Sequence, residues 1–142
     1  MVDYTKGLTF DTLRNANIAR IPTFKNAHGE LAHTEPDGSD WGPAEWLQAL
    51  VGELGEYANK RKKFDRGDLS LEEFRVEAAK ELADVQIYLD ILAMRCLDTK
   101  KHADPKGVNL GKATLDKFNE VSVRVDSPVF IDTNGRHVKF AK

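Results

Sequence analysis

The chain has 142 residues, the usual size of one domain, and its 41% hydrophobic and 31% charged residues argue for a packed core and against disorder. The net charge of −2 gives no general attraction to nucleic acid or to acidic membrane surfaces. The single cysteine excludes an internal disulfide, and there is neither a signal-peptide pattern nor an apolar run of about 20 residues. We therefore expect a soluble, cytoplasmic domain with no nucleic-acid polymer or membrane as partner.

Periodic apolar residues, with start and stop signals around them, predict four helices. Pro43 suits the first position of the second helix, and Ser70 with Glu73 forms a capping box at the start of the third. Trp41 and Trp46 are spaced as a hydrophobic staple across the start of the second helix. The expected helices cover residues 10–21, 43–64, 70–99 and 110–125, with a polar loop over residues 22–42.

Two short β-prone runs flank Asn134 and Gly135, a pair that favours a type I′ turn, so we expect a hairpin over residues 129–140. The predicted fold class is all-α: an antiparallel helix bundle with this small C-terminal hairpin. We expect a single domain over residues 1–142 with its helical core at residues 41–125. The 22–42 loop is long for a compact domain, and such loops tend to be a lid, a binding loop or a subunit contact.

Carboxylates recur at helical spacing on the second and third expected helices. Glu53 and Glu56 are three residues apart, as are Glu81 and Asp84, so each pair shares one face of its helix. Glu77 lies one turn before the second pair. The two helices are joined by a short turn and should pack antiparallel, which would bring both acidic pairs to one interface.

A cluster of carboxylates in a partly dry interface is self-repelling, and a divalent cation is its natural compensation. Ligands that are all oxygen favour Mg²⁺ or Mn²⁺ over zinc. A di-iron centre would need histidines on these helices, whereas the four histidines lie elsewhere, at positions 28, 33, 102 and 137. The alternative is that E-x-x-E is a common pattern on solvated helix faces, where acids also form salt bridges with lysines. Spacing alone leaves both interpretations open.

The stretches "ELGE" at residues 53–56 and "ELAD" at residues 81–84, with about two dozen residues between them, resemble the paired acidic motifs of the MazG-like all-α nucleoside triphosphate pyrophosphohydrolases. The resemblance extends over about residues 41–125, and "KFNEVSVRV" looks most like small phage-type members. It implies cleavage of a nucleoside triphosphate to the monophosphate and pyrophosphate. It also implies Mg²⁺, with Mn²⁺ as a substitute, held by Glu53, Glu56, Glu81 and Asp84.

Glu53 and Glu77 are the candidate catalytic residues. Glu77 lies outside the four-acid motif, where it could orient or deprotonate the attacking water. The alternative for Glu77 is an ion pair with Lys80 or Arg75.

The candidate phosphate ligands are Lys60, Lys63, Lys117 and Asn119. Lys60 lies on the acidic face of its helix. Lys63 could instead complement the dipole at the helix end. Members of the family carry a Lys and an Asn in the last helix, which Lys117 and Asn119 match.

A base needs a stacking surface and a few polar groups. The candidates are Asn15 and Asn17 on the first helix, with Trp46 as the stacking ring. A place for Trp46 in the staple or the core is the alternative.

The sequence leaves three kinds of function open. The first is a pyrophosphohydrolase acting on a deoxynucleotide such as dGTP, with dUTP or phosphoribosyl-ATP as the alternative substrate. The second is a non-catalytic binding module with an acidic groove, and the third is a different metal-binding bundle. Members of the resembled family are dimers or dimers of dimers, which implies a homodimer or a homotetramer.

Overall fold

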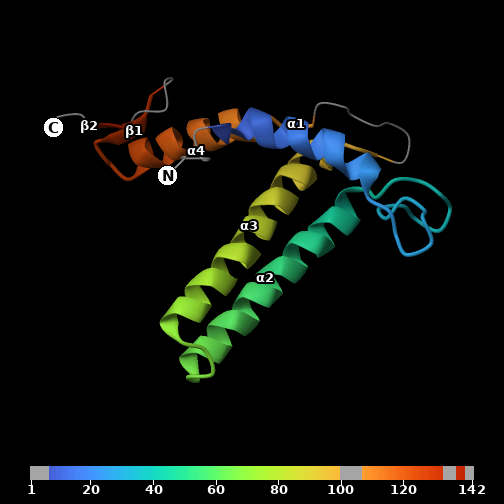
Figure 1. Cartoon of the computed structure of the whole chain (residues 1–142). Helices are drawn as coiled ribbons and strands as arrows, with labels where there is room; N and C mark the ends of the chain where they lie inside the picture. Colours follow the sequence, from blue (N-terminus) through green and yellow to red (C-terminus); the bar gives the residue numbers. More distant parts are fainter. Residues whose placement is uncertain (1–6, 100–106, 133–136, 140–142) are drawn as a thin grey trace. The chain divides into compact units, whose positions relative to one another are not determined.

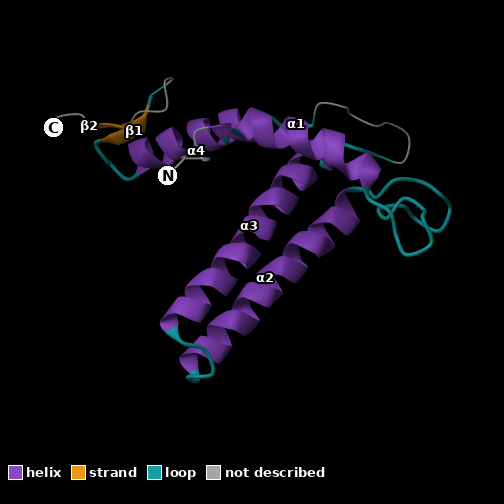
Figure 2. Ribbon diagram, in the orientation of Figure 1, coloured by secondary structure: helices purple, strands orange, loops and turns teal. Residues whose placement is uncertain are grey.

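The computed structural model describes residues 7–99, 107–132 and 137–139 (Figure 1). The described chain is mostly helical, and the expected all-α architecture with a small C-terminal hairpin is confirmed (Figure 2). Among the described residues, no helix combines the length and apolar character that a membrane span requires. The elements are α1 (Phe10–Arg20), the 3₁₀ helix η2 (Ile21–Thr23), α2 (Pro43–Asp65), α3 (Leu71–Arg95), α4 (Leu110–Arg124), β1 (Val129–Ile131) and β2 (His137–Lys139).

Contacts divide the chain into two compact units, Met1–Gly107 and Val108–Lys142. The first unit holds α1, η2, α2 and α3. The second holds α4 and the hairpin. A single domain over the whole chain stays a prediction.

Helices α2 and α3 lie side by side and antiparallel because a tight turn joins them (Figure 1). Gly67 has a φ of 83°, a left-handed conformation that glycine adopts without strain. The N–H groups of Gly67 and Asp68 donate to the carbonyls of Phe64 and Lys63, at 3.0 and 2.8 Å, and so close α2. Residues 66–70 form the turn that reverses the chain between α2 and α3.

The start of each long helix follows its sequence signal. Ser70 Oγ accepts a hydrogen bond from the Glu73 N–H, and Glu73 Oε2 accepts one from the Ser70 N–H, which confirms the capping box. Pro43 is the first residue of α2, as expected, and the Gly42 N–H donates to the side chain of Glu45 at 2.9 Å.

The staple at the start of α2 is also confirmed. The rings of Trp41 and Trp46 pack edge to face with centroids 5.1 Å apart. Trp46 is buried with Ile91 and Met94 of α3, and together they form the core at this end of the helix pair. The expected loop at residues 22–42 packs here through His33, whose ring contacts both tryptophans.

Helix α3 ends at Arg95, so the expected end at residue 99 is wrong. The Asp98 N–H donates to the Arg95 carbonyl at 2.9 Å, and the Arg95 guanidinium pairs with the Asp98 carboxylate at 3.4 Å. These contacts turn the chain before the helix can continue.

In the second unit, Asn109 caps α4 by accepting a hydrogen bond from the Lys112 N–H at 2.9 Å. Strands β1 and β2 pair antiparallel with Phe130 opposite Val138, so the expected hairpin is confirmed. The predicted turn at Asn134 and Gly135 lies outside the described residues.

Candidate metal centre

The α2–α3 pair brings carboxylates from both helices together. Because the helices are antiparallel, the step from Glu53 to Glu56 along α2 and the step from Asp84 to Glu81 along α3 run in the same direction in space. One carboxylate oxygen each of Glu53, Glu81 and Asp84 lies within 4.8 Å of the other two. These three residues are called the acidic cluster. The predicted meeting of acids across the interface is therefore confirmed for three of the four motif positions.

Glu56, the fourth motif acid, is exposed and lies outside this group of three. Its charge still reaches the site, since it helps to raise the pKa of Glu53. Its role as a metal ligand stays a prediction.

The electrostatics of the acidic cluster suit a cation. Burial raises the pKa of Glu53 above its usual value, and the charges of Asp84 and Glu81 raise it further. Tyr88 shows the same influence, because burial and then the charges of Glu53 and Asp84 raise its pKa. Three hard oxygen donors under mutual repulsion fit a divalent cation such as Mg²⁺ or Mn²⁺.

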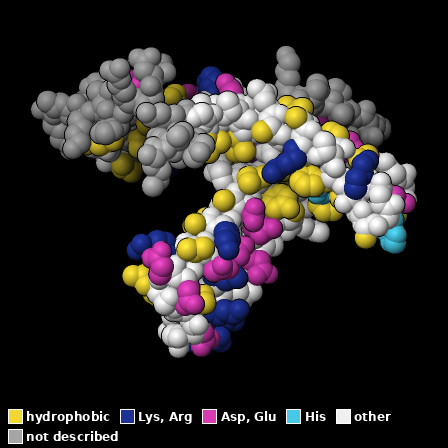
Figure 3. All heavy atoms as spheres, viewed as in Figure 1, with side chains coloured by type: hydrophobic (Ala, Val, Ile, Leu, Met, Phe, Trp, Pro, Cys, Tyr) yellow, Lys and Arg dark blue, Asp and Glu magenta, His cyan; other side chains and the backbone are white. Residues whose placement is uncertain are grey.

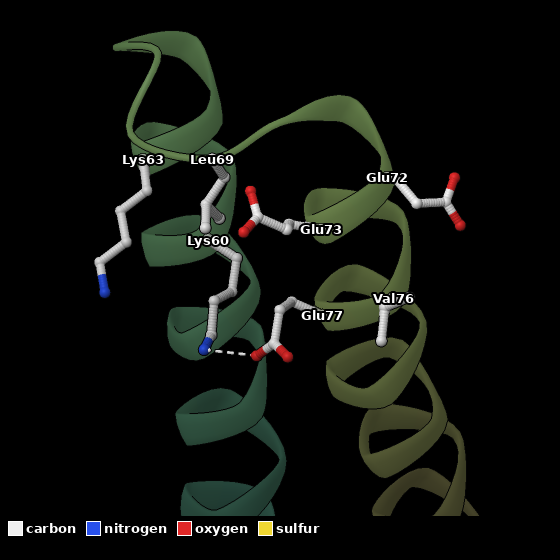
Figure 4. A pocket seen from close by; sticks show the side chains of 7 residues that line it. All are labelled: Lys60, Lys63, Leu69, Glu72, Glu73, Val76 and Glu77. Atoms are coloured by element: carbon white, nitrogen blue, oxygen red, sulfur yellow. Dashed lines mark hydrogen bonds and ion pairs between the residues drawn. The ribbon is translucent and has the colours of Figure 1, made fainter.

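Two lysines hold Glu77, one turn from the acidic cluster. The Lys60 Nζ donates to Glu77 Oε2 at 2.8 Å (Figure 4). The Lys80 Nζ donates to the other carboxylate oxygen, Glu77 Oε1, at 3.0 Å. Hydrogen bonds from Lys60 and Lys80, together with their charges, lower the pKa of Glu77 to about 2. The ion pair with Lys80, one of the two alternatives for Glu77, is confirmed. A carboxylate with so low a pKa is a weak proton acceptor.

Lys60 lies on the acidic face, as expected. Its Nζ is 3.9 Å from Oε1 of Glu81, so it contacts both Glu77 and a member of the acidic cluster. Figure 3 shows acidic and basic side chains intermixed on the visible face of the helix pair. The salt-bridge alternative for the acidic stripe is therefore realised at Glu77, while the acidic cluster keeps unbalanced negative charge.

A cavity of about 370 Å³ lies between α2 and α3 on the turn side of this ion pair. Lys60, Lys63 and Glu77 line it, with four further residues labelled in Figure 4. Lys63 is exposed there. Its role as a phosphate ligand stays a prediction.

The other two candidate phosphate ligands lie in the second unit. Lys117 is exposed and pairs with Glu120 at 2.6 Å. The Asn119 amide donates to the Ile131 carbonyl at 2.8 Å and accepts from the Ile131 N–H at 2.9 Å, which holds β1 on α4. Asn119 therefore has a structural role, and phosphate binding by either residue stays a prediction.

The three candidate base ligands differ in exposure. Asn15 is exposed, whereas Asn17 and Trp46 are 1% and 2% exposed. The core alternative for Trp46 is confirmed. A base could reach Asn17 or Trp46 only after displacing the contacts that bury them. Base binding therefore stays a prediction, and Asn15 is the candidate whose exposure fits it best.

Sequence reasoning missed a buried polar group around Asp90. Its carboxylate accepts hydrogen bonds from the Arg14 Nε and the Asn17 Nδ2, each at 2.9 Å. The signal was present, because Asp90 interrupts the apolar run "IYLDILAM" three residues after Ile87 and four before Met94. An acid at such a position predicts a buried partner.

Comparisons with known proteins assign no family. No family model matches the chain, and neither a curated protein nor a solved structure gives a significant match. The case for a function rests on the motif residues and on the geometry of the acidic cluster.

Proposed function

We propose that the chain is a Mg²⁺-dependent nucleoside triphosphate pyrophosphohydrolase, which cleaves a deoxynucleotide such as dGTP to the monophosphate and pyrophosphate. The observation that carries the proposal is the convergence of Glu53, Glu81 and Asp84, from two helices, within 4.8 Å. The raised pKa of Glu53 supports it, because repulsion in the acidic cluster is relieved when a cation binds.

The charge of the substrate explains why such a site needs a metal. A triphosphate carries about four negative charges, so carboxylates can hold it only through cations. Bound Mg²⁺ would supply the bridge between carboxylates and phosphate oxygens and would lower the pKa of the attacking water. Glu53, Glu81 and Asp84 would hold the metal, with Glu56 as a fourth ligand.

The two candidate catalytic acids differ in basicity. Glu77 is held by two lysines, so its better supported role is to orient Lys60 or a water molecule. Glu53, with its raised pKa, is the better proton acceptor of the two in the metal-free site. Lys60, which contacts Glu81, and Lys63, which lines the cavity beside it, are candidates to bind the phosphate tail, with Lys117 and Asn119 as further candidates.

The test is phosphate release from a panel of nucleoside triphosphates and phosphoribosyl-ATP, with and without added pyrophosphatase. We expect phosphate only when pyrophosphatase and a divalent cation are both present, with dGTP among the best substrates. A preference for dUTP or phosphoribosyl-ATP would support the proposed reaction but replace dGTP as the proposed substrate. No turnover of any compound with Mg²⁺ or Mn²⁺ would instead favour the non-catalytic acidic-groove module.

We also propose that the chain forms a homodimer or a homotetramer. Leu47, Val51 and Leu54 recur at four and three residues along α2, so they form one stripe, and all three are exposed. At about 100° per residue, the core residue Trp46 and the acid Glu53 lie to one side of this stripe. A second copy could cover it without blocking the acidic cluster.

A further inference from the structure

Within the described part of the helix pair, Lys60 contacts both Glu77 and a member of the acidic cluster, Glu81. Its Nζ lies 2.8 Å from Glu77 and 3.9 Å from Glu81. The side chains of Lys60 and Glu81 are only 23% and 14% exposed, so water screens this contact incompletely. Lys80 differs, because among the described residues its ion pair is with Glu77 and not with Glu81, and its side chain is 63% exposed.

The helix register explains the double contact. Lys60 lies one turn beyond Glu56 on α2, and Glu77 lies one turn from Glu81 in the opposite direction along α3. The ammonium therefore sits beside Glu77 and within reach of Glu81. A hydrogen bond from Lys60 to Glu77 raises the pKa of Lys60, and the charges of Glu77, Glu81 and Glu56 raise it further, against the effect of burial.

We propose that Lys60 is an internal counterion that competes with the metal for the acidic cluster. Without metal, its ammonium partly neutralises Glu81. When Glu81 binds a divalent cation, the two positive charges repel, and the flexible lysine stem lets the ammonium withdraw to Glu77. Glu77 thus acts as a positioning residue that keeps Lys60 beside the site. This inference rests on the proposed metal site and concerns how that site is regulated.

The competition has a consequence for substrate binding. An ammonium displaced from Glu81 keeps one carboxylate partner and becomes free to donate hydrogen bonds to phosphate oxygens. Because coupling between two binding events is reciprocal, metal binding would favour phosphate binding by Lys60, and phosphate binding would favour the metal. The metal-free site would be held in a partly neutralised state until metal and phosphate both arrive.

The test measures Mn²⁺ binding to the metal-free protein by isothermal titration calorimetry, with no nucleotide present. Lys60→Met should bind Mn²⁺ about three- to tenfold more tightly than the wild type, as expected for loss of one partly shielded competing charge. Lys60→Arg keeps the charge and should bind close to wild type. Lys80→Met is the matched control, since it removes a lysine from Glu77 but not from Glu81. Its Mn²⁺ affinity should stay within about twofold of the wild-type value.

A second readout uses thermal unfolding in EDTA and in Mn²⁺. In EDTA, the melting temperature of Lys60→Met should be lower than that of the wild type, because repulsion in the acidic cluster is no longer masked. Addition of Mn²⁺ should raise the melting temperature of this variant more than that of the wild type. Lys60→Gln provides the same comparison if the methionine variant does not fold. Unchanged or weaker Mn²⁺ binding by the uncharged Lys60 variants would overturn this inference but not the metal site. An equal gain in Mn²⁺ affinity for Lys80→Met would have the same consequence. Absence of Mn²⁺ binding by the wild type would overturn the metal site as well.

Discussion

The Asn17 side-chain amide donates a 2.9 Å hydrogen bond to the Asp90 carboxylate and so ties α1 to α3. The other carboxylate oxygen accepts from the Arg14 Nε at 2.9 Å. Asn17 and Asp90 are each 1% exposed, so these bonds replace the water that the carboxylate would otherwise hold. They fix α1 on the helix that carries Glu81 and Asp84.

Asn17→Ala should lower the free energy of unfolding by about 1–3 kcal/mol, because a buried carboxylate oxygen loses its donor. Asn15→Ala, on the exposed side of the same helix, should change it by less than about 0.5 kcal/mol. Urea denaturation of the two variants compares them directly. Equal stabilities would contradict the structural role of Asn17, and a raised KM for Asn15→Ala alone would support Asn15 as the base ligand.

The local elements could be predicted because their signals are local. The Ser70–Glu73 capping box and the Trp41–Trp46 staple depend on spacing across the start of one helix. Their outcome therefore required no knowledge of the tertiary fold.

The features that were not predicted from the sequence have a different origin. Burial of Asn17 depends on α1 packing against Asp90, 73 residues away in the chain, which periodicity within α1 does not reveal. The end of α3 was missed because the contacts of Asp98 with Arg95 stop the helix where the sequence remains compatible with it. For the site, spacing predicted the convergence of acids but not that Lys60 would contact Glu77 and Glu81 together.

Glu81→Gln should lower turnover by orders of magnitude if Glu81 is a metal ligand, since it keeps the side-chain shape but removes a charge. Stability in EDTA should hold or rise, because repulsion with Glu53 and Asp84 is relieved. The stabilisation that saturating Mg²⁺ gives the wild type, about 2.7 kcal/mol at a hundred times Kd, should shrink.

The matched control for this variant is Glu72→Gln on the same helix, whose side chain is 75% exposed and pairs only loosely with Arg75, at 3.3 Å. It should keep wild-type turnover and metal response. Reduced stability of Glu81→Gln in EDTA with intact turnover would mean that Glu81 serves a structural ion pair instead.

Acid should destabilise the metal-free protein partly through Glu77. Its pKa falls from about 4.5 to about 2 on folding, so its stabilising contribution is complete above pH 4.5 and is lost as the pH falls toward 2. Glu77→Gln lacks this contribution, and its melting temperature should fall less steeply over that range. Lys80→Met, which leaves the bond from Lys60, should give an intermediate slope. Thermal melts in EDTA would measure this, and parallel curves for all three proteins would refute it.

Val51→Glu should weaken self-association, because it places a charge in the middle of the exposed stripe formed with Leu47 and Leu54. Analytical ultracentrifugation should show a dimer or tetramer for the wild type at micromolar concentration and a smaller species for the variant. Asn59→Glu, at an exposed position farther along α2, is the control, because it adds the same single negative charge. A wild-type protein that sediments as a clean monomer would contradict the proposed homo-oligomer.

We propose that a metal held by Glu53, Glu81 and Asp84 directs cleavage between the α and β phosphates. The most direct measurement is ³¹P NMR of dGTP with the protein and Mg²⁺, without added pyrophosphatase. Binding of all three phosphates should align the attacking water, so pyrophosphate and the monophosphate should appear together, in equal amounts, from the first time point. Initial formation of orthophosphate and a nucleoside diphosphate would contradict both the proposed reaction and this placement of the metal.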